Sequence, residues 1–191
     1  MIASGPGRAL GQQGLQVVSS PFINNSSLSG TLAIADNDIW ALGSIGNTAS
    51  NVVTLAEHFN WSNWSVVSTP LVKGSLFASV AAAASNDVWT VGLQNDGSNG
   101  NAKPLIEHWN GTSWSIVASP QANIILRGIA AVSADNIWAV SGGTTEHWDG
   151  TSWSLLATPN GVNLTGVTAL SDGIVVAVGV GSNNSAVILQ N

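Results

Sequence analysis

The sequence predicts an all-β protein folded as a four-bladed β-propeller, and three observations support this prediction. A pattern of residues recurs with a period of roughly 40–50 residues, which is typical of propeller and solenoid arrays. Each repeat divides into short apolar segments separated by turn residues, as expected of antiparallel strands. No segment shows the sustained hydrophobic period of a helix. We therefore expect four-stranded antiparallel blades and essentially no helix.

Three of the repeats carry the same aromatic pattern. A Trp stands in the second apolar segment of each, at Trp40, Trp89 and Trp138. A Glu-His pair, an aromatic residue and a final Trp-Ser segment that ends at a proline follow it. These residues are Glu57, His58, Phe59, Trp64 and Pro70 in the first repeat, Glu107, His108, Trp109, Trp114 and Pro120 in the second, and Glu146, His147, Trp148, Trp153 and Pro159 in the third. Aromatic residues that recur at one repeat position are expected to pack between blades.

The first repeat shows how one blade is divided. Its turns are rich in Asn, Asp and Ser, which favour tight turns. At the last turn the second repeat has Asn110 and Gly111 and the third has Asp149 and Gly150, both favoured hairpin dipeptides. The expected order is a strand at 28–35, a turn at 36–38, a strand at 39–42, a loop at 44–51, a strand at 52–59, a turn at 60–63 and a strand at 64–67.

The fourth repeat lacks its last strand, and a matching segment stands at the N-terminus. Residues 15–21 align with the last strand of the first repeat, 64–70. We expect this N-terminal strand to complete the fourth blade and close the ring, which removes exposed sheet edges. A single domain, 1–191, would then consist of that strand and the blades 28–70, 76–120, 126–159 and 164–191. A monomer is the expected state; the alternative is an eight-bladed ring of two chains that exchange terminal strands.

The aromatic pattern resembles the kelch repeat. In kelch blades a strand ending in a glycine pair is followed by an aromatic-Asp turn and a Trp, and the third repeat is similar, with Gly142, Gly143, Trp148, Asp149 and Trp153. The more specific motif Glu-His-Trp-Asn/Asp-Gly-Thr-Ser-Trp-Ser resembles recently amplified kelch-like repeats of bacterial secreted or surface proteins. The first two repeats depart from the kelch pattern by having a single glycine, and the fourth lacks the aromatic residues. The resemblance covers residues 15–191 and implies a propeller scaffold without catalytic residues.

Composition argues against several classes of function. Only 7% of residues are charged, the net charge is −6, and the four Lys and Arg residues are spread along the chain. Nucleic-acid binding requires clustered cations, and a membrane-spanning helix requires a longer apolar stretch, so we expect neither nucleic-acid binding nor membrane insertion. The absence of Cys excludes disulfides and thiolate catalysis. Abundant Asn, Ser, Thr and Gly favour an extracellular or cell-surface location.

The histidines His58, His108 and His147 occupy one repeat position on three different blades. Equivalent positions on different blades are too far apart to share a metal ion, so we predict hydrogen bonds within or between blades. No metal and no cofactor are expected. A Ca²⁺ loop at residues 96–100 is an alternative that offers a single carboxylate.

Candidate ligand-binding residues lie outside the repeated positions. Trp61 replaces the glycine of the last turn, and a single exposed Trp can stack on a sugar or anchor a protein. The loops between second and third strands differ most between repeats and share one face with the connections between blades, where function is expected. The richest polar cluster in these loops comprises Asn95, Asp96, Asn99, Asn101 and Lys103.

The sequence thus predicts a non-catalytic binding module for a glycan or a protein, with no catalytic residue. Propeller oxidases of the galactose oxidase kind resemble kelch folds but use Tyr and Cys, and this chain has neither. Sialidase-like propellers need an arginine cluster and a Tyr nucleophile. One alternative is a structural or protein-interaction scaffold belonging to a larger surface protein. A further alternative is a hydrolase with a pair of carboxylates in a cleft.

Overall fold

The computed structural model describes residue 15 and residues 17–95 and 102–191. These ranges contain fifteen β-strands and no helix, arranged as three four-stranded sheets and one three-stranded sheet. All strand pairs are antiparallel and neighbouring strands follow chain order. None of the described segments forms a helix that could cross a membrane. The all-β, four-blade prediction is confirmed.

Each sheet corresponds to one sequence repeat. The first consists of β1 (Ser26–Ala35), β2 (Asp38–Ile45), β3 (Val53–Phe59) and β4 (Trp64–Val67). The second consists of β5 (Ser75–Ala84), β6 (Asp87–Asn95), β7 (Ala102–Trp109) and β8 (Trp114–Ile116). The third consists of β9 (Gly128–Ser133), β10 (Asn136–Ser141), β11 (Thr144–Trp148) and β12 (Trp153–Leu156). The fourth consists of β13 (Asn163–Ala169), β14 (Val175–Val180) and β15 (Ala186–Gln190).

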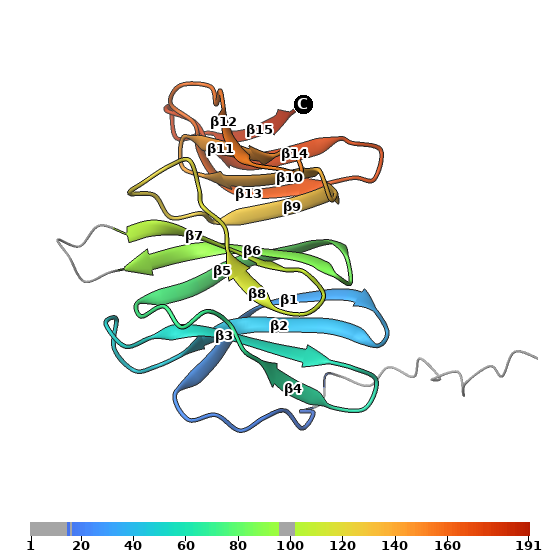
Figure 1. The fold of residues 1–191 in the computed structure, drawn as a ribbon. Helices are drawn as coiled ribbons and strands as arrows, with labels where there is room; N and C mark the ends of the chain where they lie inside the picture. The colour runs from blue at the N-terminus through green and yellow to red at the C-terminus, as the bar shows by residue number, and fades with distance from the viewer. Residues whose placement is uncertain (1–14, 16, 96–101) are drawn as a thin grey trace, which may run out of the picture.

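The four sheets are stacked face to face in chain order (Figure 1). Their first strands, β1, β5, β9 and β13, are successive neighbours. The first sheet lies at one end of the stack, together with the dark blue segment that precedes β1, and the fourth sheet lies at the other end with the C-terminus (Figure 1). The described part of residues 15–21 belongs to no strand, and no described strand pairing joins the first and fourth sheets. Closure of the ring by residues 15–21 therefore stays a prediction.

The hydrophobic core lies between the sheets, and tryptophans dominate it. Trp40 of the first sheet packs against Trp109 and Trp114 of the second, with ring centroids 5.2 and 5.3 Å apart. Trp89 of the second sheet packs in the same way on two tryptophans of the third, at 4.9 and 5.7 Å. At the first two contacts between blades the recurring tryptophans are thus packing residues, as the repeat pattern predicts, while Phe59 and Trp64 of the first blade pack on each other.

Candidate functional site

The loops of the stack emerge at two opposite ends of the strands, which we call the turn face and the connection face. Because consecutive strands are antiparallel, the tight turns β1–β2 and β3–β4 and their equivalents share one end. The connection face carries the loops 46–52, 142–143 and 181–185 and the sheet-to-sheet connections 68–74, 117–127 and 157–162. The predicted sharing of one face by variable loops and connections is correct.

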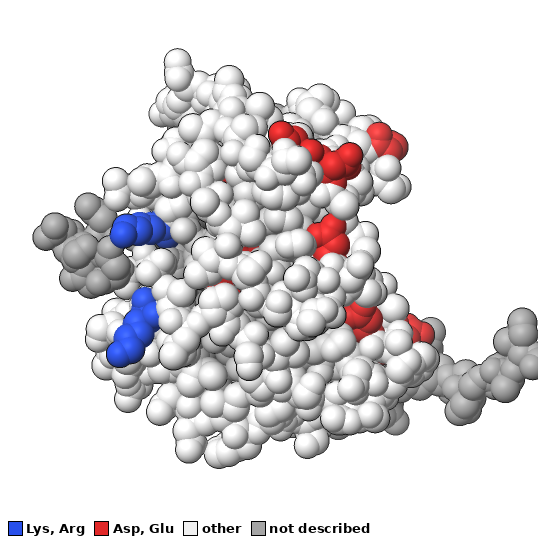
Figure 2. All heavy atoms as spheres, in the orientation of Figure 1, with Lys and Arg blue, Asp and Glu red and all other residues white. Residues whose placement is uncertain are grey.

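Charged side chains divide between these two faces. The exposed cations of the described residues, Lys73, Lys103 and Arg127, all lie on the connection face. Exposed aspartates lie in the tight turns of the turn face, at Asp36, Asp135, Asp149 and Asp172. Figure 2 shows the two kinds of charge at opposite edges of the molecule. The three described cations, which are spread along the sequence, are therefore gathered on one face, which the sequence alone did not reveal.

A cavity of about 440 Å³ opens on the connection face. Three consecutive sheets contribute to its lining, and no carboxylate is found among the described lining residues. The polar and charged lining residues are Asn123, Arg127, Ser141, Thr144 and Asn163. A ligand in this cavity would meet one guanidinium and several amide and hydroxyl groups.

The backbone of Gly142, one of the residues that line the cavity, is held by two hydrogen bonds. Its N–H donates to the carbonyl of Leu164 over 3.0 Å, and its carbonyl accepts from the Leu164 N–H over 2.7 Å. These bonds join the third sheet to the fourth. Gly142 has a φ of 55°, and Asn123 at the rim has a φ of 61°. Both values lie in the left-handed region, which Gly adopts freely and Asn tolerates.

The structure separates the candidate residues named by the sequence. Asn95 ends β6 and Lys103 lies in β7, both on the connection face next to Ala102, which lines the cavity. Asp96, Asn99 and Asn101 lie outside the described residues. Trp61 is 70% exposed but lies on the turn face, separated from Lys103 by about a strand length, ~20 Å. A single site cannot use both ends.

Sequence reasoning missed the residues that define the cavity. Arg127 is one of only four cations in the chain, and Asn123 and Asn163 lie in the blade connections. The connections could be assigned to the functional face from the strand order. Their convergence on one cavity depends on the stacking of three sheets.

The histidines form hydrogen bonds within their own blades. His58 bonds to Asp38 and His108 to Asp87, each through Nε2 over 2.8 Å, and His147 contacts Asn136 over 3.0 Å. The prediction of hydrogen bonding within or between blades is correct, and no group of three potential metal ligands occurs among the described residues. The structure adds a role for Asp38 and Asp87 that turn chemistry did not suggest.

The glutamates before these histidines are buried, and two of them, Glu107 and Glu146, contact the preceding blade. Glu107 accepts a hydrogen bond from the Thr54 hydroxyl of the preceding blade over 3.5 Å, and Glu146 accepts one from Ser119 over 2.8 Å. Burial raises the pKa of Glu57 and Glu146, and raises the pKa of Glu107 to about 8. A carboxyl with that pKa is largely protonated at neutral pH, which suits its apolar surroundings.

Comparison with known proteins identifies the fold but no family. No protein-family model matches the chain, and no curated protein matches it significantly. The solved structure described as "Structure of U3-55K" matches with a TM-score of 0.58 and 12% identity, over 88% of this chain and 53% of that one. The "RRP9 WD40 repeats" match with a TM-score of 0.59 and 12% identity, over 88% and 52%. WD40 repeats are propeller blades.

The fold is that of a β-propeller. An inactive virginiamycin B lyase from Staphylococcus aureus, solved with quinupristin, also matches, with a TM-score of 0.52 and 9% identity, over 90% of this chain and 72% of that one. At these identities the similarity shows the fold alone. The chain spans about half the length of the first two solved propellers.

Proposed function

We propose that this propeller is a non-catalytic binding module whose partner is a protein with an acidic segment, held on the connection face. The observation that carries this proposal is the cavity lined by Arg127 and by polar groups from three consecutive sheets. Rigid scaffolds with variable loops bind through those loops. Lys73 and Lys103 add positive charge to the same face, while the exposed aspartates lie on the opposite one.

The chemistry of the cavity favours carboxylates. A guanidinium such as that of Arg127 can bind a carboxylate through two parallel N–H bonds. Asn123 and Asn163 offer both donors and acceptors to a peptide backbone. Because the whole protein carries a net charge of −6, a cationic face also fixes the orientation of an approaching acidic partner.

A second candidate function, glycan binding, has one specific observation in its favour. Trp61 is exposed and has a φ of 82°, a strained conformation for a bulky residue, at a position where other repeats have Gly. Strain of this kind is retained at functional sites in many proteins, and an exposed indole can stack on a sugar ring. This site would lie on the turn face.

The repeat pattern supports a finer description of the same module. Its resemblance to amplified kelch-like repeats and its low content of charged residues favour a bacterial protein of the extracellular space or cell surface. A role as a scaffold within a larger surface protein is compatible with binding through the connection face.

The proposal is tested with a fluorescein-labelled hexaglutamate peptide, with hexalysine as the control probe. Anisotropy should show salt-dependent binding of hexaglutamate, weakened at least tenfold by Arg127→Glu and unchanged by Trp61→Ala. Asp149→Asn is the matched control, since its side chain lies on the turn face and the second repeat has Asn110 at that position. Equal binding of both peptides, or no effect of Arg127→Glu, contradicts the proposal. Sugar binding on a glycan array that is lost in Trp61→Ala would favour the second candidate.

A further inference from the structure

The fourth sheet exposes apolar side chains that other repeats bury between blades. On its side facing away from the third sheet, Val178 is 44% exposed and Ile188 is 74% exposed. The residues at the same repeat positions in the second sheet, Val91 and Ile106, are 0% and 1% exposed because the third sheet covers them. The outer side of the fourth sheet is therefore an inter-blade face without a neighbouring blade.

The outer side of the first sheet is open at β1, although Leu55 and Glu57 of β3 on the same side are 2% and 3% exposed. Leu28 pairs with Gly43 and is 49% exposed, whereas Phe77 and Leu164, which pair with the corresponding glycines, are 6% and 0% exposed. In the second and fourth sheets this position is covered by the preceding blade. The two ends of the stack thus differ in kind. The fourth sheet leaves uncovered the side that contacts a following blade in other repeats, and β1 of the first sheet leaves uncovered the side that contacts a preceding blade.

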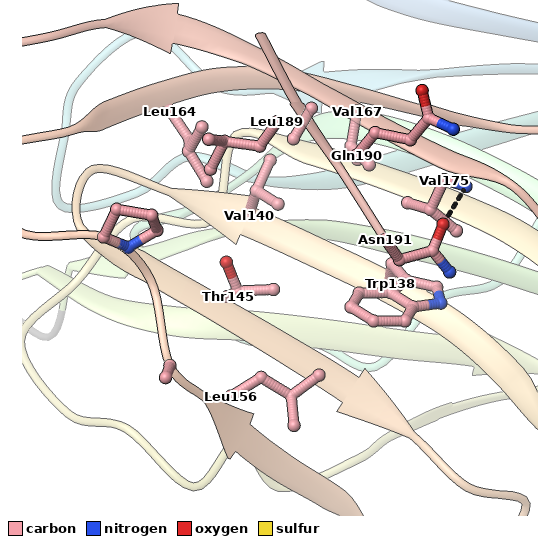
Figure 3. Close-up of a pocket in the computed structure, with 13 residues that line it drawn as sticks. Trp138, Val140, Thr145, Leu156, Leu164, Val167, Val175, Leu189, Gln190 and Asn191 are labelled. Carbon is pink, nitrogen blue, oxygen red and sulfur yellow. Dashed lines mark hydrogen bonds between the residues drawn. The ribbon is translucent and has the colours of Figure 1, made fainter. Parts of the chain in front are cut away.

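The fourth sheet also lacks the strand that would fill the space beside it. A mostly apolar cavity of about 340 Å³ lies between the third and fourth sheets, lined by Trp138, Leu156, Leu189 and Asn191 among others (Figure 3). At the other two contacts between blades, two tryptophans of the following blade fill this space, one from its third strand and one at the start of its fourth strand. They are Trp109 and Trp114 in the second blade and Trp148 and Trp153 in the third. In the fourth sheet Asn191 stands at the third-strand position, and no described residue stands at the fourth-strand position.

Residues 15–21 have the sequence expected of the missing fourth strand, but they lie next to the first sheet, at the opposite end of the stack from the fourth sheet. Leu15, Val17 and Val18 are exposed apolar residues, and the segment precedes β1. Packed sheets lie about 10 Å apart, so the fourth sheet is roughly 30 Å from the first. The four residues between Pro21 and β1 span about 15 Å at most. In this arrangement the segment reaches a sheet next to its own first sheet, not its own fourth sheet.

We propose that a second copy of this chain occupies both open faces, so that two chains form one eight-bladed ring. Residues 15–21 of each chain would then complete the fourth blade of the other. Each new contact repeats a contact already present between blades of one chain, and eight blades lie within the range of known propellers. This inference does not depend on the proposed function.

The buried glutamate of the first sheet provides an independent argument. Glu57 is buried, and no described residue donates a hydrogen bond to its carboxyl. The corresponding Glu107 and Glu146 each accept one through Oε1 from a hydroxyl of the preceding blade, while the Oε2 of all three glutamates has no partner among the described residues. By alignment with residues 64–70, Ser20 stands where Ser119 stands in the second repeat. With residues 15–21 in the partner's fourth blade, Ser20 would become the hydroxyl donor next to Glu57. Buried polar groups are rarely left without a partner.

The proposal predicts a specific strand register. In the third sheet Leu156 pairs with Thr145, so by alignment Val18 should pair with Ile188 of the other chain. The Cα atoms of such antiparallel pairs lie about 4.5–5.5 Å apart, within the range for a disulfide. The chain has no Cys, so engineered thiols have no competitors.

The experiment mixes the full-length single variants Val18→Cys and Ile188→Cys, refolds them together and oxidises them with glutathione disulfide. We expect a covalent heterodimer of the two variants, and a dimer of the wild-type chain by native mass spectrometry. Val18→Cys mixed with Ile116→Cys is the matched control, because Ile116 is apolar and 50% exposed but lies within the stack. That mixture should give no defined covalent dimer.

Two further results decide between the alternatives. Ile188→Asp should weaken dimerisation at least tenfold and leave the far-ultraviolet spectrum unchanged, and deletion of residues 1–21 should abolish the dimer. A wild-type monomer in which the double variant Val18→Cys/Ile188→Cys forms an intrachain disulfide would overturn the proposal in favour of a closed four-bladed ring. A monomer without any disulfide in the mixed or double variants would overturn it as well.

Discussion

The contact between the second and third sheets differs from the contact between the third and fourth, although both come from the same repeat. Trp89 is almost fully buried against Trp148 and Trp153 and stacks on His108 at 4.0 Å. Its counterpart Trp138 is only partly buried and lines the 340 Å³ cavity. One contact is filled by aromatic rings, and the other retains empty space.

This difference indicates that the repeated residues stabilise a contact between blades together, because each depends on the others for its packing or hydrogen bonds. The fourth repeat replaces the Trp, Glu, His and final aromatic residue together, with Val176, Leu189, Gln190 and Asn191. A His without a Trp to stack on, or a buried carboxyl without a hydroxyl, would cost stability, so the members are present or absent as a group. Where Leu189 replaces the glutamate, the Thr158 hydroxyl is bonded to Thr145 over 2.8 Å instead.

The largest difference between the two contacts should appear when their tryptophans are removed. Trp89→Ala leaves a cavity in a filled contact and should lower the free energy of unfolding by about 3–5 kcal/mol. Trp138→Ala enlarges an existing cavity and should cost roughly 1–2 kcal/mol. Urea denaturation of both variants in the Ile188→Asp background, in which the proposed dimer is weakened, measures this difference. Equal losses there would contradict the cavity, whereas in the full-length wild-type background the proposed partner strand would fill the cavity and bring the two losses closer together.

The pH dependence of stability should reflect the buried glutamates of the filled contacts. The pKa of Glu107 is about 8 in the folded protein and near 4.5 when unfolded, so the folded state binds more protons between these values. Its contribution is therefore full below about pH 4.5 and is lost as the pH rises through 8. Glu107→Gln should reduce the fall in stability between pH 5 and 9.

The matched control for this change is Asp149→Asn. The pKa of Asp149 is lowered to about 2, chiefly by the hydrogen bond from the Thr151 hydroxyl, so this carboxylate does not titrate between pH 5 and 9. Its variant should keep the wild-type slope of unfolding midpoint against pH. An unchanged slope in Glu107→Gln would contradict the burial argument.

A smaller difference in stability should follow when the hydroxyl groups at the two contacts are removed, Ser119 between the second and third sheets and Thr158 between the third and fourth. Ser119→Ala leaves the Glu146 carboxyl buried without its donor and should cost roughly 1–3 kcal/mol. Thr158→Ala removes a bond between two hydroxyls that lie closer to solvent and should cost about 1 kcal/mol or less. Thermal unfolding of the two variants ranks the losses, and the reverse order would refute the assignment of Ser119 to the tighter contact.

The smallest effect concerns the last turns of the first and second blades. Trp61 and Gly111 occupy the same turn position with φ of 82° and 90°. Trp61→Gly should relieve backbone strain and stabilise the fold by about 1 kcal/mol. Gly111→Ala should destabilise it by a similar amount, because an added Cβ would lie 2.8 Å from the Cβ of Asn86. Differential scanning calorimetry tests both, and a less stable Trp61→Gly variant would mean that the indole contributes packing that outweighs the strain.

Much of the fold could be predicted because each blade is defined locally. Turn dipeptides such as Asp149 and Gly150 and the recurring Trp positions mark strands, turns and blade boundaries within a few residues. The sequence predicted that the histidines form hydrogen bonds, but it did not identify their partners. Asp38, for example, lies 20 residues before His58. The connection-face cavity could not be located, because its residues come from three sheets.

The sequence by itself determined the strands, the number of blades, the aromatic layers and the absence of thiol chemistry, because these follow from short-range periodicity and composition. Only the tertiary structure decided that Lys73, Lys103 and Arg127 share one face, that Trp61 and Lys103 lie at opposite ends, and that the fourth sheet has an open apolar face. These features depend on the relative placement of whole sheets. That placement is set by packing between residues far apart in the chain, where local periodicity carries no information.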